Sequence, residues 1–159
     1  MLKKYIISFL LLLVVGGFFL NSKVNKSIAK TILLNKYVDH VKSANNGYLK
    51  ISKINLKEDL YDFNSKYNSL DYGLQVLNLN PLVIAGHSGY GTNALFNNLT
   101  KLNVDDNLFI SYNYQNNNYK ITNIYEKEKK DLLLLAGDLE LVTCVKNTDK
   151  QIVIIGQKS

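Results

Sequence analysis

Residues Leu82–Gly91 read LVIAGHSGYG, a short apolar segment that runs directly into a glycine-rich turn. An apolar run of four residues, opened by Pro81 and closed by a glycine, is typical of a strand that is buried on both faces. Other short strand-like segments precede and follow it along the chain, with residue ranges 48–55, 74–79, 107–113, 119–125, 139–145 and 151–156.

Very little helix separates these segments. Apolar residues recur at helical spacing only between Thr92 and Leu102, where one internal helix is expected. The stretch Gln115–Asn118 reads as a turn, and the charged residues 126–130 read as a solvated loop. Seven or eight short strands with so little helix predict a closed β-barrel rather than a βαβ sheet.

The composition excludes several classes of protein. At 159 residues, 47% hydrophobic and 20% charged, the chain suits one folded domain. Its single cysteine rules out an internal disulfide, and one cysteine with two histidines cannot build a closed zinc site, so no metal or cofactor is expected. The net charge of +6 comes from scattered lysines without any arginine. Because specific nucleic-acid contacts depend on arginine and on a clustered basic face, no nucleic-acid partner is expected.

The amino-terminal residues predict a membrane anchor. Tyr5–Leu20 carries no charge and follows Lys3 and Lys4, which favours a single-pass signal anchor with its amino terminus in the cytoplasm and the rest of the chain outside. A cleaved secretory signal is the alternative, and it delivers the same domain to the same side. Residues 23–44 have the pattern of an amphipathic helix, on which His40 is a surface or packing residue. The expected organisation is an anchor at 1–21, a helical stalk at 22–46 and a β-barrel domain at 47–159.

The glycine-rich turn does not fit the common motifs. Its glycines are spaced G-x-x-G-x-G, which is not the dinucleotide fingerprint, and no Gly-Lys-Ser/Thr follows. A serine nucleophile elbow also fails, because Tyr90 stands where its second glycine would be. Once these motifs are excluded, His87 is the remaining candidate functional residue in the turn.

A second candidate is the cysteine at the end of Leu139–Cys144, LELVTC. Alternation places Cys144 with Glu140 and Val142, on the face opposite Leu139 and Leu141. A histidine or a cysteine at the end of a strand is, taken alone, more often structural than catalytic. A nucleophilic thiol nevertheless needs a base beside it, and histidine is the usual one, so the pair His87 and Cys144 leaves a structural and a catalytic interpretation open.

The same residues resemble the sortases, the membrane-anchored cysteine transpeptidases of Gram-positive bacteria. The resemblance covers about Gly47 to Gly156, and its carriers are GYLKISKIN, LDYGLQVL, LVIAGHSGYGTNALFNNLTKL, LELVTC and QIVIIG. It implies an eight-stranded barrel with one or two short helices and with His87 and Cys144 as the catalytic pair. It also implies cleavage of an LPxTG-like carboxy-terminal sorting signal through a thioacyl enzyme on Cys144. The partners would be secreted proteins with such signals and an amine acceptor, either a cell-wall precursor or a pilin lysine.

The chain departs from the sortase pattern in two places. Sortases carry an arginine at the start of the last strand, and here either Gln151 or Lys150 would take its place. The stretch Glu126–Asp138 is also short where many relatives carry a longer recognition loop. Besides a transpeptidase, the sequence leaves open a sortase-fold binding protein with weak or no activity and a cysteine hydrolase that releases its acyl group to water.

Overall fold

The computed structural model describes Ile28, residues 30–34, 45–129 and 135–159. Residues Ala44–Ser159 group into one compact unit. Ile28 and residues 30–34 are helical and exposed, within the predicted stalk. The predicted anchor at Tyr5–Leu20 and the stalk residue His40 lie outside the described residues. Within the described part of the chain, no helix has both the length and the apolar character needed to cross a membrane.

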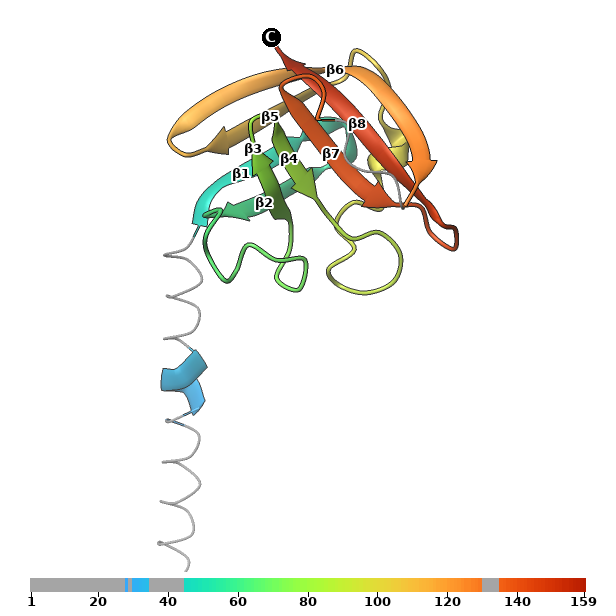
Figure 1. Cartoon of the computed structure of the whole chain (residues 1–159). Helices are drawn as coiled ribbons and strands as arrows, with labels where there is room; N and C mark the ends of the chain where they lie inside the picture. The colour runs from blue at the N-terminus through green and yellow to red at the C-terminus, as the bar shows by residue number, and fades with distance from the viewer. Residues whose placement is uncertain (1–27, 29, 35–44, 130–134) are drawn as a thin grey trace, which may run out of the picture. The chain divides into compact units, whose positions relative to one another are not determined.

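The described domain is mainly β, as predicted, and its eight strands form one curved sheet around a core (Figure 1). The sheet order is β2-β1-β5-β6-β8-β7-β4-β3. All neighbours pair antiparallel except β4 and β7, which run parallel. The strands are β1 (Asn45–Ile51), β2 (Leu56–Tyr61), β3 (Gln75–Leu79), β4 (Leu82–Ala85), β5 (Asn107–Tyr112), β6 (Gln115–Glu128), β7 (Leu139–Cys144) and β8 (Lys150–Lys158).

The barrel is nearly closed. No ladder among the described residues joins β2 to β3, and the loop between these strands contributes hydrogen bonds to the edge of β3. The Asn68 side-chain amide lies along the free edge of β3, where it accepts from the Val76 N–H at 2.6 Å and donates to the Val76 carbonyl at 2.8 Å. Across the interior, the Tyr112 hydroxyl donates to the Tyr61 carbonyl of β2 at 3.1 Å. At the edge of β3, the Asn68 side chain thus provides the hydrogen bonds that a neighbouring strand would otherwise make with Val76.

Four local predictions differ from the structure. The stretch Thr92–Leu102 is not a helix but a series of turns that ends in a 3-10 helix, η2 (Leu99–Lys101). Its apolar residues still reach the core, since Phe96, Leu99 and Leu102 are buried. Segment 48–55 is the strand β1 followed by a 3-10 helix, η1 (Ser52–Ile54), and β2 comes after it as an additional strand.

The predicted turn and charged loop are both parts of β6. The chain reverses at Asn113 and Tyr114, whose φ values of 50° and 61° suit a two-residue hairpin turn. The residues Gln115–Asn118 therefore already pair with β5. The charged residues up to Glu128 pair with β8, because solvent on the exposed face of an extended strand accommodates charges as well as a loop does.

Candidate active site

Strands β4, β7 and β8 lie side by side (Figure 1). They bury two separate sets of apolar side chains. The barrel interior takes Ile84, Leu141 and Ile154, which belong to the main core. A smaller cluster on the other face of the same strands consists of Val83, Val142, Val153 and Ile155. We call this other face the outer face. Alternation along β7 puts Cys144 on the outer face, with Val142 and Glu140.

The parallel pairing of β4 with β7 brings the ends of both strands together. The last residue pair of this ladder is Ala85 with Val142. Two residues further along both segments, His87 and Cys144 therefore lie opposite each other. Three hydrogen bonds continue this pairing past the end of β4. The Gly86 N–H donates to Val142 O at 3.1 Å, Thr143 Oγ1 donates to Gly86 O at 2.8 Å, and Ser88 Oγ donates to the Cys144 carbonyl. Neighbouring strands are about 4.8 Å apart, so His87 and Cys144 occupy adjacent positions.

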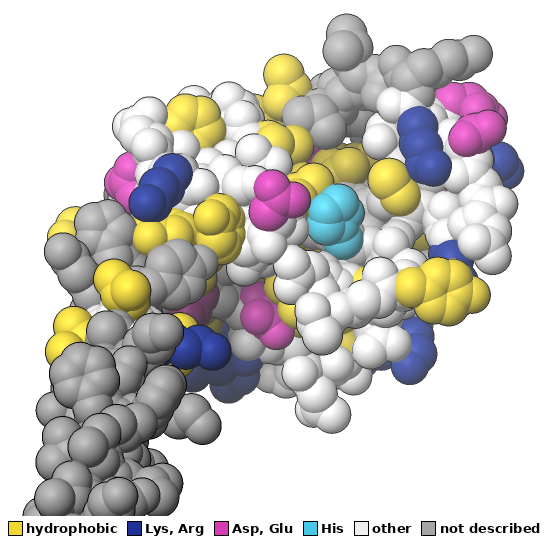
Figure 2. Space-filling view, turned by 90° about the horizontal axis from the view of Figure 1, so that it is seen from below, with side chains coloured by type: hydrophobic (Ala, Val, Ile, Leu, Met, Phe, Trp, Pro, Cys, Tyr) yellow, Lys and Arg dark blue, Asp and Glu magenta, His cyan; other side chains and the backbone are white. Residues whose placement is uncertain are grey.

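Gly86 allows the turn before His87 to pack tightly. A Cβ at this position would lie 2.6 Å from the ring of Phe96 and 2.8 Å from the side chain of Leu74. The Phe96 N–H in turn donates to the His87 carbonyl at 2.9 Å. The backbone of His87 is therefore held by buried residues, while its side chain is exposed. Figure 2 shows a histidine side chain at the surface of the face seen from below, and His87 is the one histidine among the described residues.

Gln151 lies on the other side of Cys144 from His87, so that the three residues form a row across β4, β7 and β8. In the antiparallel ladder of β7 and β8 it stands directly opposite Cys144, and its side chain is 9% exposed. Directly opposite residues have their Cβ atoms about 5 Å apart on the same face. The ladder thus places Gln151, and not Lys150, beside the thiol.

Lys150 is engaged elsewhere. Its ammonium lies 2.6 Å from Glu126 Oε1 on β6. The hydrogen bond to Glu126 and the charge of that carboxylate raise the pKa of Lys150 above its ordinary value. The salt bridge therefore holds the lysine on the β6 side of β8.

Two charged residues on the neighbouring strands have a burial that the sequence did not predict. Lys127 on β6 is the ladder partner of Gln151 and is half-buried, although the sequence places it in a solvated loop. Glu140 is fully buried on the outer face: its Oε1 accepts from the Ala136 N–H at 2.7 Å, while Oε2 has no hydrogen-bond partner among the described residues. Lys127 lies beside Gln151 because β6 is longer than the local sequence pattern indicates.

The row His87, Cys144 and Gln151 has the components of thiol chemistry. Cys144 is exposed at the end of its strand, so a substrate can reach the sulfur. An imidazole at a neighbouring position can take the thiol proton, and the Gln151 amide can donate to an oxygen that becomes negative during acyl transfer.

Comparison with known proteins identifies the family of the chain. The family model of the sortase domain matches residues 49–159, which include all three residues of the row and most of the chain. The chain belongs to the sortase family. A search of the curated proteins found no match.

Solved sortase structures share the fold. The complex of Streptococcus agalactiae sortase C1 with MTSET has a TM-score of 0.63 at 22% identity, over 74% of this chain and 70% of that one. Clostridium perfringens sortase C with the C-terminal cell wall sorting motif has a TM-score of 0.62 at 22% identity, over 72% and 70%. Sortase A from Corynebacterium diphtheriae has a TM-score of 0.62 at 23% identity, over 72% of this chain and 60% of that chain. At these identities the likeness shows the fold of this sortase.

Proposed function

We propose that this sortase is a cysteine transpeptidase that cleaves a carboxy-terminal sorting signal and transfers the new carboxyl end to an amine. The observation that carries the proposal is the register of β4, β7 and β8, which aligns His87, Cys144 and Gln151 in one row. A sortase of Clostridium perfringens with the same fold has been solved with a cell wall sorting motif. The predicted anchor at Tyr5–Leu20 would hold the domain on the outer side of the cell membrane, where such substrates are exported.

In the first half-reaction the Cys144 sulfur attacks the carbonyl carbon of the scissile peptide bond. His87 takes the thiol proton and passes it to the departing amine as the carbon–nitrogen bond breaks and the thioester forms. Gln151 donates a hydrogen bond to the carbonyl oxygen while it carries negative charge.

The second half-reaction reverses these steps with a new nucleophile. An amine of a wall precursor or a pilin lysine attacks the thioester, His87 takes its proton, and the sulfur leaves with a proton returned to it. Water in place of the amine would give simple hydrolysis by the same residues.

Mass spectrometry of the purified full-length chain tests the proposal. Incubation with a panel of LPxTG-like peptides should produce a covalent acyl adduct on the wild-type enzyme. The Cys144→Ala variant should form no adduct with any of these peptides. His87→Gln should slow adduct formation by about 10²-fold or more, because the general base is lost. An adduct that persists in Cys144→Ala, or a wild type that processes no peptide in the panel, would contradict the proposal.

The acceptor is determined in the same experiment. Added triglycine should convert the adduct to a peptide longer by three glycines, and the amount of free acid should fall in proportion. If the free acid remains the sole product at high amine concentration, the enzyme is a hydrolase and the transferase part of the proposal is wrong.

A further inference from the structure

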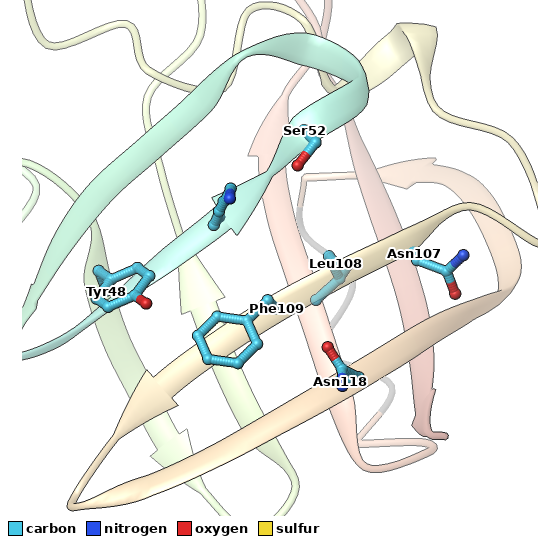
Figure 3. A pocket seen from close by; sticks show the side chains of 7 residues that line it. Tyr48, Ser52, Asn107, Leu108, Phe109 and Asn118 are labelled. Atoms are coloured by element: carbon cyan, nitrogen blue, oxygen red, sulfur yellow. The ribbon is translucent and has the colours of Figure 1, made fainter.

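A pocket of about 410 Å³ lies on the outside of the sheet, over β1, β5 and β6. This volume is within the range of small-molecule sites in proteins. In the sheet order, β6 and β8 separate β1 and β5 from β7, which carries Cys144. Figure 3 shows the side chains around the pocket, which come from β1, η1, β5 and β6. Those on which the argument depends are Tyr48, Lys50, Ser52, Asn107, Phe109 and Asn118.

Two aromatic rings form the apolar part of the pocket. The centroids of Tyr48 and Phe109 are 5.6 Å apart, with their planes tilted by 37°. Both side chains are half-buried although they stand on the outside of the sheet. A partly exposed aromatic pair on the outside of a sheet is a common sign of a ligand surface.

Neutral polar groups surround these rings. Asn118 is the ladder partner of Phe109, while Asn107 and Ser52 lie at the other end of the pocket (Figure 3). An amide side chain both donates and accepts hydrogen bonds, as does a hydroxyl. Sugar hydroxyls have the same dual character, and the apolar faces of sugar rings fit against aromatic rings.

Positive charge exceeds negative charge around the β1 and β2 side of the pocket, where two lysines accompany one aspartate. Lys50 stands directly opposite Lys57 in the ladder of β1 and β2, and the Lys57 ammonium lies 5.0 Å from the centroid of the Tyr48 ring. Within the described part of the chain, neither lysine forms an ion pair and no acidic side chain lines the pocket. Asp59, the ladder partner of Tyr48, is an exposed carboxylate on the same face. Like charges directly opposite each other are destabilising, and an anion bound between them would relieve this repulsion.

We propose that this pocket binds an acidic saccharide, that is, a sugar carrying a carboxylate or a phosphate group. The sugar ring packs on Tyr48 and Phe109, its hydroxyls bond to Asn107 and Asn118, and its anionic group lies at Lys50 and Lys57. The site does not use Cys144 and goes beyond the proposed transpeptidase activity.

Isothermal titration calorimetry of the full-length chain tests the site with four probes. These are a galacturonic acid trisaccharide, a phosphorylated mannose trisaccharide, neutral cellotriose and inorganic phosphate. One or both acidic saccharides should bind more tightly than cellotriose and inorganic phosphate, and the tighter of the two identifies the anionic group. Cys144→Ala should bind as the wild type does, which separates this site from the transpeptidase.

Variants then locate the binding. Lys50→Gln should weaken acidic saccharides by about three- to fivefold, the value of one exposed ion pair, and leave cellotriose unchanged. Phe109→Leu keeps apolar bulk but removes the flat ring, and should weaken every saccharide by about fivefold. Lys101→Gln and Tyr114→Ala, with exposed side chains outside the pocket, are the matched controls. Absence of saccharide binding, equal affinity for cellotriose or inorganic phosphate, or equal losses in the controls would overturn the proposal.

Discussion

Gln151 lies directly across the ladder from Cys144, where the proposed acyl transfer would require a hydrogen-bond donor. A neutral amide can fill this role, but it supplies less stabilisation to a developing negative charge than a guanidinium does. Loss of a good oxyanion donor typically costs about 2.7 to 4 kcal/mol, or roughly 10² to 10³ in rate. Because the chain has no arginine, we expect that a variant with a guanidinium at this position would react faster.

We predict that Gln151→Arg raises the rate of thioacyl formation by about tenfold or more, because it adds a charge and a planar set of donors beside Cys144. Lys150→Arg is the matched control, and it should leave the rate unchanged because its side chain pairs with Glu126. Rapid-quench mass spectrometry with a sorting peptide measures both. If Lys150→Arg forms the thioacyl enzyme faster than the wild type, or if neither variant changes the rate, the residue opposite Cys144 in the ladder is not the oxyanion donor.

At the scale of elements, the sequence predicts best where strands are apolar on both faces. The ranges of β4 and β7 follow directly from the runs LVIA and LELVTC. The strand β2 is missed because its sequence LKEDLY holds three charges, and its buried Leu56 and Leu60 are four residues apart. The helix expected over Thr92–Leu102 fails because turns can also bring residues at that spacing to a core.

The candidate site was also predicted only in part from the sequence. His87 and Cys144 are visible in the sequence as chemistry-bearing residues at strand ends. Their proximity depends on parallel pairing between strands far apart in the chain, and local periodicity carries no information about that pairing. Lys127 lies beside Gln151 only because β6 is long enough to pair with the start of β8.

The junction of η1 with the turn before β5 gives a pH-dependent test. Asp106 accepts from Lys53 Nζ and from the Asn103 N–H, both at 2.7 Å. The hydrogen bond from Lys53, followed by that from the backbone, lowers the pKa of Asp106 below its ordinary value. Because the folded pKa is the lower one, the stabilisation is complete above the ordinary aspartate pKa and is lost as the pH falls through the folded value.

Asp106→Asn should therefore lower the free energy of unfolding near neutral pH by up to about 1 kcal/mol, since the pair is partly exposed. The difference from the wild type should disappear as the pH falls below about 4. Urea unfolding over a series of pH values measures it, with Asp105→Asn at the more exposed pair with Lys120 as the control. A difference that stays constant down to the lowest pH would exclude this linkage.

At the scale of the whole molecule, the barrel depends on the seam between β2 and β3. Val76 of β3 is buried, and its N–H and carbonyl on the seam side bond to Asn68. An edge strand without such partners would leave backbone groups unpaired and open to aggregation. The pairing of β3 with β4 connects this seam to the strand that ends at Gly86 and His87.

We predict that Asn68→Ala destabilises the domain by about 2 to 3 kcal/mol, because two hydrogen bonds to the buried backbone of Val76 are lost together. Amide exchange should accelerate first at Val76 and in β3, and less at Ile154 in the centre of the sheet. Asn64→Ala is the matched control, since this exposed side chain in the same loop forms no hydrogen bond with a described residue. Equal exchange at Val76 and Ile154 would mean that the seam opens only with the whole barrel. In that case Asn68 would stabilise the global fold and would not act as a local closure of its edge.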